Sequence, residues 1–77
     1  MPQAHARFVR TYNVNVHYSI QPETNQDGLY HITIDGYGTY LARPLQGFET
    51  RRQFKYSDLI MTEKATYVLI ELIDSTH

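Results

Sequence analysis

Two histidines, His17 and His31, are the side chains with the sharpest chemistry in the sequence. Each stands on the polar side of a stretch in which polar and apolar residues alternate, and Asp35 shares that side. Histidine titrates near neutral pH, and imidazole and carboxylate groups together bind divalent metals. A hairpin that brought these three residues together would therefore form a metal site or a pH-sensitive contact.

The pairing of the two stretches decides whether the histidines meet. With Tyr18 opposite Tyr30, the two imidazoles face each other across the hairpin, with Cβ atoms about 5 Å apart. With Tyr18 opposite Ile32, His31 faces Ser19 instead. Both histidines can equally be solvent-exposed residues on the polar side of a hairpin that bind no ligand. We therefore predict no metal site and keep the histidine site as the minor alternative.

A second group of residues combines cationic side chains with aromatic rings. Tyrosine and arginine are enriched at the energetic centres of protein interfaces, and seven tyrosines are many for 77 residues. The basic run from Arg43 to Lys55 would contact an acidic surface. We expect a partner protein to contact Arg43, Arg51, Arg52, Lys55, Tyr56, Tyr37 and Tyr40.

Two other functions would use the same segment. A sheet with exposed aromatic rings stacks nucleic-acid bases while its cations bind phosphates. A small ribonuclease of the toxin type would use the chemistry of Arg51, Arg52, Lys55 and Tyr56. Both need a basic surface, whereas the net charge of the chain is −1. Protein binding is therefore the favoured function, and nucleic-acid binding is the alternative.

The sequence contains no motif for catalysis or for a cofactor. It has no glycine-rich dinucleotide fingerprint, phosphate loop or nucleophile elbow. Its three serines lie outside the kind of turn that exposes a nucleophile, and its acidic residues are scattered. We predict a regulatory or binding protein that is not an enzyme and uses no cofactor.

Length and composition bound the remaining expectations. A chain of 77 residues forms one domain, which we place at 1–77. A domain this small buries only about 60% of its unfolded surface. It contains no cysteine and thus no disulfide, so we expect it to associate as a homodimer. It has no signal peptide and no apolar run of the roughly 20 residues that cross a bilayer, so the predicted location is the cytoplasm.

Alternating apolar and polar residues predict the strands that position these groups. The alternation covers 6–20 and 29–40, and the polar segment between them ends in Asp-Gly, as a hairpin loop does. Even-numbered residues of both strands should then share the buried side. Gly36 and Gly38 fall on that side, where a missing side chain allows a bend or the close approach of another element.

Two further strands complete the predicted fold. Residues 48–56 alternate again, with Phe48 and Phe54 expected in the core. Residues 65–74 are dense in β-branched residues and predict a fourth strand, whereas a helix over 58–73 that begins at Ser57-Asp58 is the alternative. The predicted class is mainly β, a small antiparallel sheet of about four strands. The alternative is α+β, with the C-terminal helix packed on the sheet.

Overall fold

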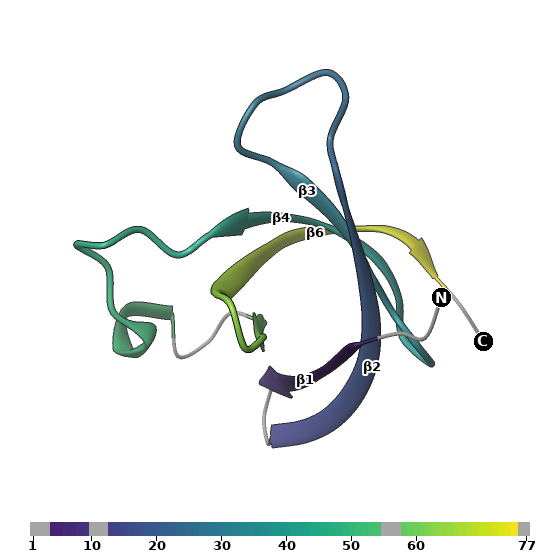
Figure 1. Cartoon of the computed structure of the whole chain (residues 1–77), viewed down its shortest axis with the longest axis horizontal. Helices are drawn as coiled ribbons and strands as arrows, with labels where there is room; N and C mark the ends of the chain where they lie inside the picture. Colours follow the sequence, from purple (N-terminus) through teal and green to yellow (C-terminus); the bar gives the residue numbers. More distant parts are fainter. Residues whose placement is uncertain (1–3, 10–12, 55–57, 76–77) are drawn as a thin grey trace.

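Six antiparallel strands close into a barrel in the computed structural model of the chain, which describes residues 4–9, 13–54 and 58–75 (Figure 1). Around the barrel the strands follow the order β1-β2-β3-β4-β6-β5, and β5 pairs with β1 to close it. The elements are β1 (Ala4–Val9), β2 (Asn13–Pro22), β3 (Tyr30–Ile34), β4 (Gly38–Pro44), the 3₁₀ helix η1 (Arg51–Phe54), β5 (Leu59–Met61) and β6 (Thr66–Ser75). Within these ranges, no helix is long or apolar enough to cross a membrane.

The mainly β class and the antiparallel pairing are confirmed, but the sheet of about four strands is wrong. Each strand of the predicted hairpin is in fact two strands. Residues 6–20 contain β1 and β2, with Phe8 opposite Val14, and residues 29–40 contain β3 and part of β4, with Ile34 opposite Gly38. In both hairpins an even-numbered residue faces another, so the apolar residues stay at even positions on both sides of the chain reversal. The alternation is interrupted between the paired strands at Arg10 and at Gly36, but one polar residue or one glycine does not by itself predict a turn.

The predicted strand over 48–56 is wrong for the residues that the structure describes. Residues 51–54 form η1, and the residues before it form a loop. Polar side chains in this segment bond to nearby backbone groups, such as the Thr50 N–H that donates to Oε1 of Gln53 at 2.7 Å. Local bonds of this kind compete with strand pairing. Residues 55 and 56 lie outside the described residues.

The C-terminal third forms strands, so the helix over 58–73 is wrong and the strand over 65–74 is confirmed as β6. The turn between β5 and β6 is fixed by Thr62, whose N–H and hydroxyl both donate to the carbonyl of Ala65 at 2.8 Å. The same hydroxyl accepts the Ala65 N–H at 3.0 Å. This closed turn reverses the chain, so the residues on either side pair with each other.

The barrel interior is filled from the even-numbered side of β1 to β4, which confirms the predicted division into a buried and a wet side, whereas in β5 both Leu59 and Ile60 are buried. Odd-numbered neighbours such as His5, Arg7 and His17 are exposed. Phe8 is fully buried, and its ring meets Tyr37 and Tyr40 edge to face at centroid distances of 4.9 and 6.1 Å. The buried cluster consists of Ala6, Phe8, Val16, Tyr18, Ile32, Ile34, Tyr40, Ala42, Ile60 and Leu69.

Gly38 allows β4 and β6 to approach each other closely at one end of the barrel. It lies opposite Ile34 on one side and Ser75 on the other, and its φ of +135° is one that side-chain-bearing residues rarely adopt. A Cβ at this position would overlap the carbonyl oxygen of Asp74 and lie 3.1 Å from Cδ1 of Leu72. The expected close approach of another element at Gly38 is therefore confirmed.

The barrel is closed by a strand of three residues, β5, which is shorter than both of its neighbours. It pairs with Arg7 to Val9 of β1 and with Thr66 to Val68 of β6. The remaining residues of β1, Ala4 to Ala6, have no second strand beside them in the described part of the chain. The same holds for Ile70 to Ser75 of β6, which we call the β6 edge.

Candidate functional site

His17 and His31 do not meet, because the register of β2 and β3 differs from both predicted pairings. Tyr18 lies opposite Ile34, and Gln21 lies opposite His31. The alternative in which the two histidines face each other across β2 and β3 is therefore wrong. The register differs from each prediction by an even number of residues, which leaves every apolar side chain on the same side of the sheet. The alternation of apolar and polar residues therefore could not by itself identify the observed register.

Each histidine has another neighbour instead. His17 lies opposite His5, with the ring centroids 4.3 Å apart and an angle of 66° between the rings. Nε2 of His31 lies 2.6 Å from Oε2 of Glu23. The pKa of the Glu23 carboxyl is lowered, first by the backbone N–H of Asn25 and then by His31. The two imidazoles thus belong to separate contacts.

Asp35, the third residue of the predicted metal alternative, is exposed next to the turn between β3 and β4. Its backbone N–H donates to the carbonyl of His17 at 2.9 Å. Among residues 4–9, 13–54 and 58–75, no three histidine or acidic side chains come together in a way that could hold a metal ion.

The residues after β4 form a loop over 45–54, which we call the Phe48 loop. It projects from the side of the barrel, at the left in Figure 1. The N–H of Leu45 donates to the carbonyl of Thr66 at 2.8 Å, which ties the start of the loop to β6. The loop ends in η1.

An ion pair organises the Phe48 loop from within. Nη1 and Nη2 of Arg43 donate to Oε1 and Oε2 of Glu49 at 2.9 and 3.0 Å, in the bidentate geometry that is the strongest for this pair. Oε1 of Glu49 also accepts the N–H of Gln46 at 2.8 Å. The guanidinium of Arg43 lies 5.5 Å from the ring centroid of Phe54, so one side chain links β4, the middle of the loop and η1.

Phe48 stands out of this organised loop with 84% of its surface exposed. The expectation that Phe48 lies in the core is therefore wrong, while Phe54 is half-buried. The sequence neighbours of Phe48 give the reason for its exposure. Gln46 and Glu49 bond to each other through backbone and side chain, and this turn directs the intervening phenylalanine to solvent. Arg52 is also exposed on the same loop.

The structure separates the residues that were predicted to contact a partner. Arg43 is engaged with Glu49, Tyr37 is half-buried against Phe8, and Tyr40 is buried with 7% of its surface exposed. Arg51 begins η1 and Arg52 follows it at the surface. Lys55 and Tyr56 lie outside the described residues. Of the predicted set, Arg52 on the Phe48 loop is thus exposed.

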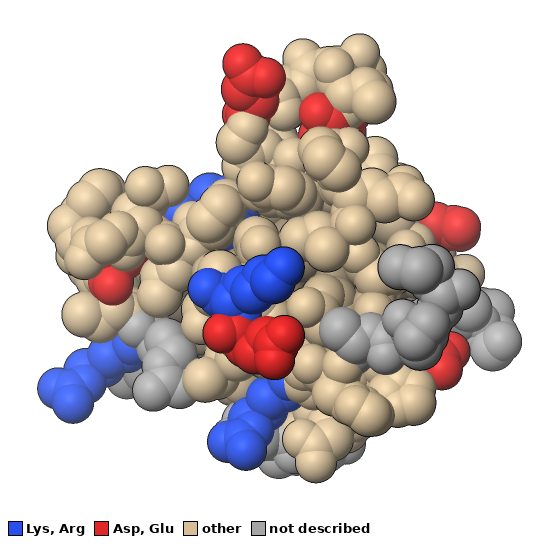
Figure 2. All heavy atoms as spheres, viewed as in Figure 1, with Lys and Arg blue, Asp and Glu red and all other residues tan. Residues whose placement is uncertain are grey.

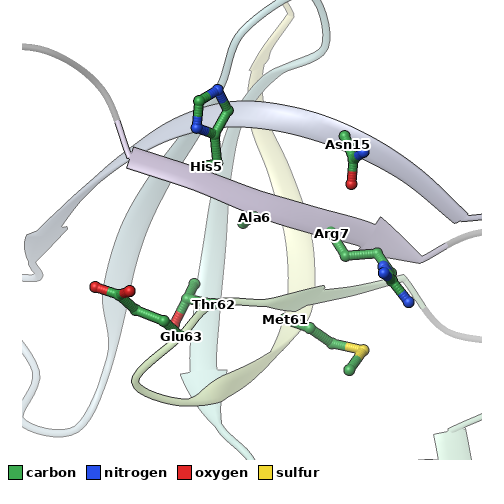
Figure 3. A pocket seen from close by; sticks show the side chains of 7 residues that line it. All are labelled: His5, Ala6, Arg7, Asn15, Met61, Thr62 and Glu63. Carbon is green, nitrogen blue, oxygen red and sulfur yellow. The ribbon is translucent and has the colours of Figure 1, made fainter.

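A second feature is a shallow groove of about 450 Å³ where β1 extends past β5 (Figure 3). His5 and Asn15 stand above β1 in this view, and the turn after β5 forms the opposite wall. Arg7 and Glu63 point away from each other toward opposite ends. The groove is open to solvent, so water competes for its polar groups. Its lining consists of His5, Ala6, Arg7, Asn15, Met61, Thr62 and Glu63.

The charged side chains form no extended patch of one sign on the face shown in Figure 2, where cations and carboxylates are interleaved. A protein that holds a nucleic-acid backbone gathers its cations along one face or groove. The face in Figure 2 has no such row of cations.

No protein-family model, curated protein or solved structure matches this chain. The choice among candidate sites therefore depends on the contacts and exposures given above.

The Arg43–Glu49 pair gives the Phe48 loop a defined response to acid. Hydrogen bonds from Arg43 and then from the Gln46 N–H hold the pKa of the Glu49 carboxyl below its ordinary value of 4.5. The pair therefore stabilises the loop above pH 4.5, and this contribution is lost as the pH falls through the lowered pKa. We expect the Gln46 amide signal in NMR spectra to titrate with a midpoint below 4.5. Arg43→Gln should raise that midpoint, whereas Arg52→Gln should not, and equal midpoints in all three proteins would contradict this role.

Proposed function

We propose that the protein is a non-enzymatic binding module that contacts another protein through the Phe48 loop. The observation that supports this most directly is the 84% exposure of Phe48 on a loop whose backbone is fixed by the Arg43–Glu49 pair. A large apolar side chain on a backbone that is already ordered loses less freedom on binding than one on a mobile segment. Aromatic side chains of this kind fill pockets at the centres of interfaces.

The charges of the loop suggest what surrounds that pocket on the partner. Glu49 is neutralised by Arg43, so the exposed Arg52 contributes positive charge to the same loop as Phe48. An apolar pocket with an acidic rim would complement this surface, because opposite charges at a rim accelerate association and select the partner.

Nucleic-acid binding is less well supported by the same residues. It would require a row of open aromatic rings on the sheet, yet Tyr40 is buried and Tyr37 packs against Phe8. Retention on single-stranded DNA or RNA at low salt, lost steeply as salt is raised, would favour that function over the one proposed.

Phe48→Ala should weaken partner binding while the fold is kept. Removing a central aromatic side chain costs about 2 kcal/mol or more of binding, or about 30-fold in affinity, whereas a change at the surface alters stability by about 0.5 kcal/mol or less. The measurement is affinity capture from host extract with the wild-type chain and the variant, quantified by mass spectrometry. Phe48→Leu is the matched control that keeps an apolar side chain. Proteins captured equally by the wild type and Phe48→Ala would refute this contact surface.

The expected homodimer stays a prediction. It is read from the same samples, because light scattering of the free protein at high concentration reports its mass. A mass near twice 9.0 kDa supports the dimer, and a mass near 9.0 kDa refutes it.

A further inference from the structure

We propose that the β6 edge, Ile70 to Ser75, is a second binding site, which takes an extended basic segment of another protein as an added strand. This site is separate from the Phe48 loop. Figure 1 shows the C-terminal end of β6 at the right of the barrel and the loop at the left. The two sites are thus far enough apart to be occupied together.

β5 begins at Leu59, and among the described residues no strand pairs with one side of the β6 edge beyond that point. β5 pairs with β6 up to Val68, and one further bond runs from the N–H of Leu69 to the carbonyl of Asp58 at 3.0 Å. From Ile70 onward, no strand lies beside this side of β6 in the described part of the chain. Unpaired N–H and C=O groups along a strand are a template for a strand from another chain.

The β6 edge carries large apolar side chains although it is exposed to solvent. Ile70, Leu72 and Ile73 each leave about half of their surface in solvent, at 49, 48 and 48%. Together with Phe48, they are the large apolar residues that are exposed in the described chain. Clustered apolar side chains along an open edge mark a contact surface rather than scattered surface residues.

Two irregularities in the pairing of β4 with β6 place these side chains. The register shifts between Thr39 and Tyr40 and again between Leu41 and Ala42. Each shift leaves one extra residue on β6, Ile73 at the first and Ile70 at the second. A bulge turns the side chain of the extra residue away from the regular alternation. Because of the two bulges, apolar side chains that regular alternation would bury or place on opposite faces are exposed together on the β6 edge.

The charges of the edge identify the partner as basic. Glu71 and Asp74 are exposed, and the segment from Ile70 to Ser75 has no lysine or arginine. A second copy of this chain fits poorly. Full antiparallel overlap of two such edges would place each Glu71 opposite the Asp74 of the other copy, and like charges directly opposite destabilise a strand pair. A strand that alternates apolar and basic residues matches both the apolar side chains and the carboxylates.

The test uses a seven-residue peptide that alternates lysine and valine as a probe, added to the ¹⁵N-labelled protein. We expect the amide signals of Ile70 to Asp74 to shift, and their hydrogen exchange to slow, with an affinity that falls as salt is raised. The same peptide with glutamate in place of lysine should not bind. The double variant Glu71→Lys/Asp74→Lys should weaken binding of the lysine peptide at least tenfold. Glu63→Lys, which makes the same kind of charge change on the turn after β5, should leave it unchanged.

The proposal would be overturned by amide shifts confined to residues outside the β6 edge, or by equal binding of the lysine and glutamate peptides. Equal affinity of the double variant and Glu63→Lys for the lysine peptide would also overturn it. Self-association of the wild type that the double variant strengthens would identify a second copy as the occupant and would also overturn it. Phe48→Ala should bind the peptide like the wild type, so a failure at the Phe48 loop and a failure at the β6 edge are distinguishable.

Discussion

Phe8→Ala is expected to remove a large part of the stability of the protein. The ring is fully buried and meets both Tyr37 and Tyr40. Its strand pairs on one side with β2 and on the other with β5, with Phe8 opposite Val14 and Ile60. Replacing a buried phenylalanine by alanine costs about 3–5 kcal/mol. The free energy of unfolding of a domain of this length is about 4–12 kcal/mol, so the change removes a large part or all of it.

The free energy of unfolding in urea measures this effect, with circular dichroism as the signal. His5→Ala is the control, because this residue is exposed on the same strand and its change should stay within about 0.5 kcal/mol. A loss below about 1 kcal/mol for Phe8→Ala would show that Phe8 is not part of the core.

Gly38→Ala should be the next most damaging change, although it adds a single methyl group. The backbone there has a φ of +135°, and the new Cβ would overlap the carbonyl oxygen of Asp74. Strain from such a conformation costs about 1–3 kcal/mol, and the overlap with backbone is relieved only if β4 and β6 move apart. We therefore expect a loss of more than about 2 kcal/mol, together with weaker protection of the amides of β6.

Gly47→Ala is the matched control for this substitution. A Cβ at Gly47 would meet no atom within 4 Å, and alanine restricts the unfolded chain, so stability should stay equal or rise by a few tenths of a kcal/mol. Urea unfolding of the two variants, side by side, gives the comparison. Equal effects at both glycines would mean that the contact with Asp74 does not limit the approach of β4 and β6.

The sequence predicted the chemistry of each side of the sheet better than the path of the chain. Even-numbered residues such as Val16 and Ile34 are buried as expected, because a half-buried strand needs period-two alternation. The turn between Val9 and Asn13 was missed since alternation survives a hairpin whose facing residues are both even-numbered. For the same reason the pattern allowed several registers, and the predicted proximity of His17 and His31 failed with the register.

The candidate sites were predictable only in part, for a different physical reason. The segment with Arg43 and Arg52 was expected to contact a partner, but the bond between Arg43 and Glu49 depends on a loop where a strand was expected. That loop turns Phe48 outward, which no periodic pattern indicates. Nor did the sequence indicate that the pairing of β5 with β6 would begin only at Leu59, opposite Val68, because the ends of strands depend on pairing rather than on composition.

The small strand β5 also constrains the order in which the chain can fold. Four of the pairings, β1 with β2, β2 with β3, β3 with β4 and β5 with β6, join strands that are neighbours in sequence. Pairing β5 with β1 brings Phe8 beside Ile60, about 50 residues away along the chain, and a long loop loses more entropy on closure than a hairpin does. The meander of hairpins is therefore the natural nucleus, and the first and fifth strands join late, once the intervening chain is already compact.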